Sequence, residues 1–269
     1  AAGSVRSAVT MSRFGERQFR QSLDRVIDPH ELWITGGDFT NRTPFQIEIV
    51  EPPKVDRMLL DCDYPAYTGL NEVDPQPVNV QGARVNLPLE TRFVLRARAN
   101  KPLLGVHLRT PRLQLDVATG GTAQNGSTAH ESSLTILEAG DLAGRRIPLP
   151  PGVAEQLLPG DRRTFVLPLH LAASAEDALQ QLARAASAEG DLAVRSLPDP
   201  LPLPPALPLQ LYLEDEDGIQ SFEPATVTIH GVPDLPPEIA AQLTAIDRRI
   251  TRRATIPIEG RIIDDYGGV

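Results

Sequence analysis

Hydrophobic and polar residues alternate in short runs along much of the chain, and turn-forming residues separate these runs. Residues 45–49 read apolar, polar, apolar, polar, apolar, which is the period of a β-strand with one buried face. Residues 225–229 alternate in the same way. Glycine, proline and acidic residues interrupt the runs and favour turns. The pattern therefore predicts a protein built mainly from short strands.

One strand–turn–strand pattern occurs twice, at residues 31–50 and again at 209–230. Leu32 opens a short run with an aromatic residue at its centre, and Leu211 holds the equivalent position in the second copy. A glycine-rich or acidic turn follows in each copy, then an alternating strand, then a pair of prolines. Repetition of a supersecondary unit along a chain is typical of tandem domains. We therefore predict repeated β-domains.

The segments that follow the two proline pairs also correspond. Residues 93–97 and 256–260 both alternate and lead through a polar turn to a Gly-Val pair. Residues 239–250 carry apolar side chains at helical spacing. Their counterpart after the first proline pair reads as a strand, so we predict a strand there. Both ends of the chain interrupt this pattern, and we expect them to belong to a longer protein.

The longest departure from the repeat lies between residues 111 and 208, where we expect an insertion. Residues 174–189 have the features of a helix: Ser174 as N-cap, Asp177 three residues later, and Leu179 and Leu182 on one face. We expect this helix to pack on the rim of the sandwich.

Two further segments of the insertion have recognisable patterns. Residues 163–171 read as a strand that Pro168 should confine to a sheet edge or a bulge. The proline-rich stretch 197–209 favours an extended polyproline-like conformation.

The composition narrows the class of function. The formal net charge is −9, and nucleic-acid binding requires a clustered basic face. We therefore expect no nucleic-acid partner. A single cysteine rules out an internal disulfide framework. The chain has no apolar run of the length that a membrane helix needs, so we expect no membrane contact by this segment itself.

Several of these stretches carry a resemblance. The sequences YPAYTG at 64–69 and DDYG at 264–267 carry it best, together with the proline pairs and the strands beside them. They resemble large membrane-anchored bacterial proteins of unknown function, which contain tandem immunoglobulin-like domains. The resemblance implies a segment in the cell envelope, periplasmic or extracellular, without catalytic activity. It supplies no site residues.

We accordingly predict an all-β fold of tandem immunoglobulin-like β-sandwich domains, with one short helix in the insertion. The predicted boundaries are 1–53 for the C-terminal part of a first domain, 54–235 for a complete sandwich with an insertion at 111–208, and 236–269 for a connector and the first strands of a third domain.

The acidic turn at residues 214–217 is the most prominent candidate site. Asp215 and Asp217 are the candidate calcium ligands, and Asp264 and Asp265 hold the corresponding place in the next unit. Calcium takes six to eight oxygen ligands, and no twelve-residue loop with a closing bidentate glutamate is present here. Aspartate and glycine also favour hairpin tips. We therefore expect a solvated turn and no cofactor.

The remaining candidate residues give weaker indications of a functional site. Cys62 has no histidine near it in sequence, so we expect a small buried side chain rather than a nucleophile. Trp33 is expected in the core of a sandwich. No zinc-ligand spacing occurs among the five histidines, which are His30, His107, His130, His170 and His230.

The predicted function is a non-catalytic structural or adhesive array in a bacterial cell envelope, presenting loops to an unknown protein or surface partner. One alternative is a carbohydrate-binding accessory module, which an aromatic platform on a sheet face would favour. The other is a hydrolase with a site in 111–208, which His130 or His170 beside a carboxylate would favour.

Overall fold

The computed structural model describes residues 7–23, 26–73, 77–80, 82–119, 132–138, 143–149, 152–187, 200–244, 252–253 and 255–266. Contacts within the chain divide it into two units, Ala1–Glu51 and Pro52–Val269. The polar loop 120–131 and part of the proline-rich stretch lie outside the described residues, as do Ile246 and Ile250.

The first unit consists of three two-stranded sheets, β1-β2, β3-β6 and β4-β5. Its strands are β1 (Ser12–Arg13), β2 (Phe19–Arg20), β3 (His30–Leu32), β4 (Thr35–Gly36), β5 (Phe39–Thr40) and β6 (Phe45–Ile47). The prediction that Trp33 is a core residue is wrong, because its exposed fraction is 53%. Trp33 follows β3, which pairs only with β6 among the residues that the structure describes.

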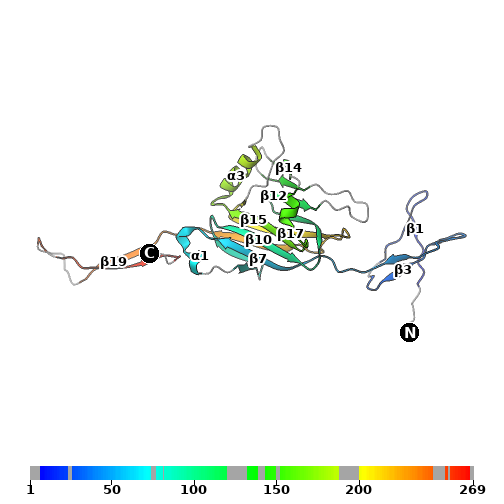
Figure 1. Cartoon of the computed structure of the whole chain (residues 1–269), viewed down its shortest axis with the longest axis horizontal. Helices are drawn as coiled ribbons and strands as arrows, with labels where there is room; N and C mark the ends of the chain where they lie inside the picture. Colours follow the sequence, from blue (N-terminus) through cyan, green and yellow to red (C-terminus); the bar gives the residue numbers. More distant parts are fainter. Residues whose placement is uncertain are drawn as a thin grey trace. The chain divides into compact units, whose positions relative to one another are not determined.

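The second unit contains two large sheets (Figure 1). Its strands are β7 (Val55–Asp63), β8 (Val78–Asn79), β9 (Arg84–Pro88), β10 (Arg92–Ala99), β11 (Leu103–Arg109), β12 (Leu113–Ala118), β13 (Ser133–Ile136), β14 (Arg146–Pro148), β15 (Thr164–Leu171), β16 (Leu201–Leu203), β17 (Ala206–Asp215), β18 (Ala225–Val232), β19 (Glu238–Leu243) and β20 (Ile258–Ile263). The five-stranded sheet has the order β16-β15-β10-β7-β8, and the seven-stranded sheet has the order β14-β13-β12-β11-β17-β18-β9. Most neighbours are antiparallel, but β15–β16 and β18–β9 are parallel.

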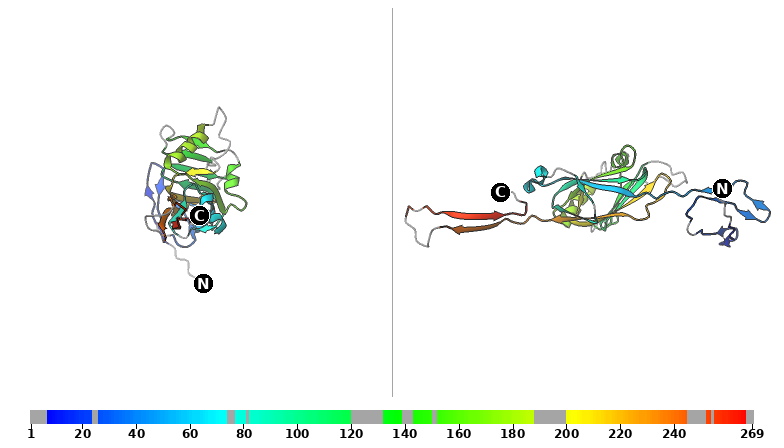
Figure 2. Two further views of the ribbon diagram at one scale, coloured as in Figure 1. Left: turned by 90° about the vertical axis from the view of Figure 1, so that its left-hand side faces the viewer. Right: turned by 90° about the horizontal axis from the view of Figure 1, so that it is seen from below.

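Both sheets contribute to one hydrophobic core. Alternation along each strand explains this core, because successive side chains point to opposite faces. In β10, Phe93, Leu95 and Ala97 are buried, whereas Arg92 and Arg96 are exposed. The second view in Figure 2 shows strands of the two sheets in separate layers. The chain is therefore mainly β, as predicted, and the second unit is compatible with a β-sandwich.

The segment between residues 111 and 208 supplies strands to both sheets rather than only a peripheral element. Strand β12 lies inside the seven-stranded sheet, and β15 lies between β10 and β16. The prediction that Pro168 restricts its strand to an edge or a bulge therefore needs correction. Strand β16 pairs only with Leu169–Leu171, so the missing N–H of Pro168 faces no strand on that side.

Helix α3 (Ala175–Ser187) confirms the one predicted helix. The hydroxyl of Ser174 accepts a hydrogen bond from the Asp177 N–H at 3.1 Å and donates one to the Asp177 carboxylate at 2.6 Å. Leu182 belongs to the core, and Leu179 is half-buried. The helix contacts β16. Three short helical segments were not predicted: η1 (Ala66–Thr68), α1 (Leu70–Val73) and α2 (Val153–Leu157).

Part of the proline-rich stretch forms strands instead of polyproline helix. Residues 201–203 form β16, and β17 begins at Ala206. Leucines alternate with prolines or other residues here, so that Leu207 and Leu209 point into the core while Pro208 is exposed. Burial of these leucines stabilises the strand. The polyproline II conformation is less stable here because it makes no internal hydrogen bonds.

The two copies of the repeated hairpin pair in the same register. Leu32 is opposite Phe45 in β3–β6, and Leu211 is opposite Ala225 in β17–β18. These are the positions that correspond in the sequence repeat, and the next two pairs correspond as well. The register is therefore a shared property of both hairpins.

The strands after the two proline pairs correspond at their first pair, and a bulge between Arg98 and Ala99 shifts the later pairs of β7–β10 by one residue relative to β19–β20. Val55 is opposite Ala99 in β7–β10, and Ile239 is opposite Ile262 in β19–β20. Strand β19 confirms the prediction of a strand at Ile239. Every residue of β20 is exposed. In the part of the chain that the structure describes, every helix is too short or too polar to span a lipid bilayer.

Candidate functional site

The acidic turn after β17 is organised by Asp215, which is only 2% exposed. Its Oδ2 lies 2.9 Å from Lys101 Nζ. Its Oδ1 accepts backbone N–H groups of Asp217 at 3.1 Å and Ile219 at 2.9 Å. The expected solvated turn is found at Asp217, which is exposed, but not at Asp215. Because both oxygens of Asp215 are engaged within the protein, this residue serves the turn and its ion pair.

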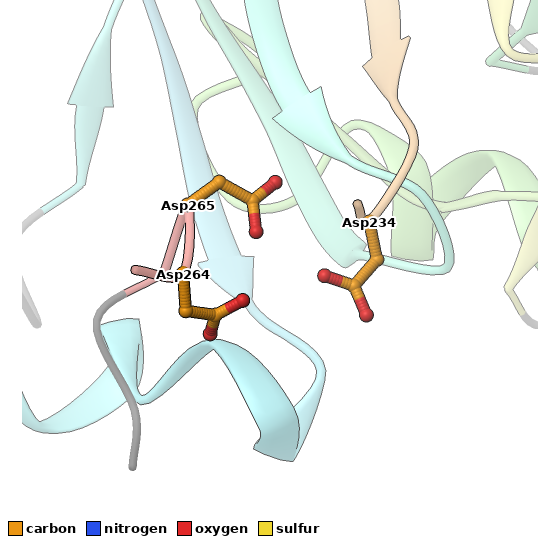
Figure 3. Close-up of side chains that lie close together, drawn as sticks. All are labelled: Asp234, Asp264 and Asp265. Atoms are coloured by element: carbon orange, nitrogen blue, oxygen red, sulfur yellow. The ribbon is translucent and has the colours of Figure 1, made fainter. Parts of the chain in front are cut away.

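A second group of acidic residues lies between the end of β18 and the segment after β20. The carboxylates of Asp234, Asp264 and Asp265 lie within 4.8 Å of one another (Figure 3). Asp265 also accepts a hydrogen bond from the Leu235 N–H at 3.4 Å. Slight desolvation and the carboxylates of Asp265 and Asp264 raise the pKa of Asp234. Oxygen ligands of this kind suit a hard cation, but three side chains fall short of the six to eight that calcium takes.

Two stretches that carry the family resemblance meet beside this group. The rings of Tyr67 and Tyr266 are 5.8 Å apart, edge to face, with an interplanar angle of 75°. Aromatic pairs of this geometry stabilise a structure modestly, in addition to the stabilisation from the surface area that they bury. Tyr67 follows β7 in the short segment η1, whereas Tyr266 follows β20. The aromatic pair therefore links the end of the β19–β20 hairpin to the segment around η1.

A histidine between two carboxylates lies on the outward face of the seven-stranded sheet. His107 on β11 is opposite Asp116 on β12 and Tyr212 on β17. Its Nδ1 is 2.8 Å from Asp116 Oδ1, and its Nε2 is 3.6 Å from Glu214 Oε2. The Nε2 atom is buried and has no hydrogen-bond partner within 3.5 Å. The three ionisable groups form a closely coupled set, which we call the His107 cluster: His107, Asp116 and Glu214.

The hydrogen bond that His107 Nδ1 donates to Asp116 raises the pKa of His107, and this effect outweighs the opposing effect of burial. Burial would raise the pKa of Asp116, but hydrogen bonds from His107 and Gln114 outweigh burial and lower it. Gln114 Nε2 lies 3.1 Å and 3.0 Å from the two Asp116 oxygens. The cluster therefore favours a protonated histidine beside an ionised aspartate.

The His107 cluster could not be predicted from the sequence. Alternation within each strand places all three side chains on outward positions. That signal says nothing of the order β12-β11-β17, which alone makes His107, Asp116 and Glu214 neighbours. His107 and Asp116 are nine positions apart in the chain and Glu214 is far from both, so the three residues have no recognisable ligand spacing.

The alternative functions would need an aromatic platform on a sheet face, or His130 or His170 beside a carboxylate. The ring of Tyr212 lies on the outward face of a sheet, but the Arg109 guanidinium covers it at 4.8 Å from the ring centre. His170 lies on β15 opposite Arg92, and His130 lies outside the described residues.

Cys62 packs against the hydrophobic core and is half-buried. Burial raises the pKa of its thiol to about 11, so the thiolate that a nucleophile requires is scarce at neutral pH.

Comparison of the chain with protein-family models, with curated proteins and with solved structures finds no match.

Proposed function

We propose that this chain is part of a tandem array of immunoglobulin-like β-sandwich domains that has a non-catalytic structural or adhesive role in a bacterial cell envelope. In this proposal residues 1–53 complete one domain, residues 54–235 form the next, and residues 236–269 begin a third. Exposed loops of such domains make any contacts with partners.

The shared register of the hairpins carries the proposal. The pair Leu32–Phe45 and the pair Leu211–Ala225 hold equivalent positions in sequence and in pairing. A strand register is set by the hydrophobic pattern and the turn together. Two hairpins with the same pattern and the same register are what duplication of a domain produces.

Exposed apolar side chains at equivalent positions support the same proposal. Ile258 in β20 is 65% exposed, whereas its counterpart Leu95 in β10 is 1% exposed. Ile239 is likewise exposed, and its counterpart Val55 is half-buried. A large apolar side chain stabilises a fold by about 1.5–3 kcal/mol when it is fully buried. The β19–β20 hairpin thus has the apolar face of a sandwich sheet, ready to pack against further strands.

The chemistry of the described residues favours a non-catalytic role. The Nε2 of His107 is enclosed and faces the Glu214 carboxylate rather than a hydroxyl or thiol. A catalytic dyad of histidine and aspartate needs that nitrogen open to its nucleophile.

Cross-linking tests the repeat. In a Cys62→Ser background, one double variant carries Glu31→Cys with Gln46→Cys, and a second carries Gln210→Cys with Thr226→Cys. Both pairs are directly opposite across their strands, so both should oxidise to disulfides under mild conditions. The shifted control Gln210→Cys with Ala225→Cys places its side chains on opposite faces and should stay reduced. Failure of the Glu31 pair alone would contradict equivalence of the hairpins.

A replacement experiment tests the role. Residues 54–235 are replaced in the cell by an unrelated β-sandwich of similar length. A structural role predicts that the replacement preserves envelope integrity, measured as exclusion of an impermeant dye. An adhesive role predicts intact exclusion with lost surface attachment. Loss of a chemical activity after the replacement would refute the non-catalytic proposal.

A further inference from the structure

The His107 cluster joins three strands at the end of β17. His107 comes from β11, Asp116 from β12 and Glu214 from the last turn-facing part of β17. Gly105 lies directly opposite Glu214. A Cβ at Gly105 would lie 3.8 Å from both His107 Nε2 and Glu214 Cβ, and 3.3 Å from the Val117 carbonyl oxygen. The glycine therefore leaves the space in which the imidazole and the Glu214 side chain meet.

The protonation state of His107 decides whether Glu214 has a hydrogen-bond donor. A neutral imidazole has one N–H, and an imidazolium has two. With the Nδ1 proton shared with Asp116, a neutral ring turns the lone pair of Nε2 toward the Glu214 carboxylate. Glu214 is 8% exposed, and a buried carboxylate facing an acceptor is unfavourable. A protonated ring instead directs an N–H at Glu214.

The charged groups around His107 also favour its protonated form. From β12, Asp116 and the neutral Gln114 face the ring; from β17, Glu214 and Tyr212 face it. On its own strand, the one nearby cation among the described residues that interact with this cluster is Arg109, whose guanidinium stacks on Tyr212. One carboxylate on each side of the ring, from Asp116 and from Glu214, outweighs this cation and favours the protonated imidazole.

We propose that the His107 cluster is a proton-operated clasp that holds the end of β17 and the acidic turn after it against β11 and β12. When His107 is protonated, it bridges Asp116 and Glu214 and the clasp is closed. When His107 loses its proton, Glu214 is released and the turn loosens. Nothing in this device depends on the structural or adhesive role proposed above.

The turn beyond Glu214 is the element that responds. Glu214 forms an isolated β-bridge with Gln220, and Asp215 closes the turn through Asp217 and Ile219. The ion pair of Lys101 with Asp215 holds this end of β17 without involving His107. The clasp therefore changes the order of the turn while the strand stays paired.

The direction of the pH response follows from the raised pKa of His107. A folded-state value above the ordinary 6.5 means that the stabilisation is fully present below that pH and is lost as the pH rises through the folded-state pKa. The lowered pKa of Asp116 sets the acid limit, because its contribution is lost as the pH falls through that value. The clasp is closed between these limits.

Nuclear magnetic resonance of the full 269-residue chain tests the proposal. The imidazole signals of His107 give its titration midpoint, and the backbone amides of Asp217 and Ile219 report the turn. We expect a midpoint above 6.5, amide signals that follow the same midpoint, and broadening of those signals on the alkaline side. In His107→Gln this transition should disappear. In the control His230→Gln, which removes a histidine of the same sheet, the transition should remain.

Glu214→Gln keeps the shape of its side chain and provides a second readout if His107→Gln fails to fold. It should lower the His107 midpoint, because one of the two flanking carboxylates is gone, and it should uncouple the turn amides from that titration. A His107 midpoint at or below 6.5, turn amides that do not follow it, or a transition that survives in His107→Gln would each overturn the proposal.

Discussion

The hairpins β3–β6 and β17–β18 share a pattern and a register, yet they differ in nearly everything that determines stability. Leu211 is 1% exposed in β17, whereas its counterpart Leu32 is only half-buried. Val227 is 1% exposed, and its counterpart Ile47 is half-buried. Strand β17 lies between β11 and β18 in a seven-stranded sheet, but in the described part of the chain β3 has β6 as its one partner. Local sequence therefore sets how two strands pair, while neighbouring strands determine what the pairing contributes to stability.

The turns of the two hairpins differ in the same sense. The turn after β17 has a buried aspartate with an ion pair, whereas the corresponding turn of the first hairpin lies between β4 and β5 and is exposed throughout. Gly37 there has a positive φ of 61°, which glycine adopts without cost. A turn can therefore be closed either by backbone freedom or by a buried polar network.

Truncation of the equivalent leucines should give the largest contrast. Leu211→Ala removes a fully buried side chain and should lower the free energy of unfolding by about 2–5 kcal/mol. Leu32→Ala should change it by about 0.5 kcal/mol or less. Urea denaturation of the two variants, followed by far-ultraviolet circular dichroism, measures both. Equal losses would mean that the first hairpin is as fully packed as the second.

Removal of the Lys101 charge should have the next largest effect. Lys101→Met leaves the buried Asp215 carboxylate without its cation and should cost about 1–3 kcal/mol. Asp38→Asn, in the exposed turn of the first hairpin, is the matched control and should have almost no effect. Thermal melting at constant pH compares the two, and a similar shift in both would disprove the assigned role of the Lys101–Asp215 pair.

Loss of the α3 N-cap tests an element that, like the repeated strand–turn–strand pattern, was predicted from local sequence. Ser174→Ala removes both hydrogen bonds to Asp177 and should cost about 1 kcal/mol. The effect should be confined to the helix, seen as faster amide exchange at the start of α3 with unchanged exchange in β10. Ser174→Thr retains the cap and serves as the control. Faster exchange throughout both sheets would show that α3 is integral to the core.

Calcium should have the smallest effect. If the acidic residues hold no ion, millimolar calcium leaves the melting temperature unchanged, whereas a ligand at a hundredfold excess over its Kd stabilises by about 2.7 kcal/mol. Differential scanning calorimetry with and without a chelator makes the measurement.

An upward shift in that experiment would contradict the expectation, and two variants would locate the ion. Loss of the shift in Asp215→Asn with Asp217→Asn would place it at the acidic turn. Loss of the shift in Asp234→Asn would place it beside Asp264 and Asp265.

Much of the local structure could be predicted, because its causes lie within a few residues. The alternation in residues 93–97 and the capping pair Ser174 and Asp177 led to the right elements. The exposed Trp33 was not predicted, since an aromatic residue in a strand reads the same whether or not a second sheet covers it. The strand at Leu201–Leu203 was also missed, because burial by distant strands outweighed the preference of a proline-rich segment.

The residues of the candidate site likewise differ in how far the sequence could identify them. Asp215 could be selected from its acidic neighbours, but its burial and its bond to Lys101 depend on the pairing of β11 with β17. As an isolated histidine in the sequence, His107 was not a candidate site residue. It became a candidate only when β12 and β17 took places on either side of β11.

The sequence alone sufficed to predict the strand-rich character of this protein, the repetition of its hairpins and the start of its helix. Each of these follows from side-chain period, turn residues or a cap within a short stretch of chain. The tertiary structure alone decided which leucines are buried and that His107 stands between Asp116 and Glu214. Burial and charge coupling depend on contacts between residues far apart in the chain, and local pattern does not encode the order in which strands assemble.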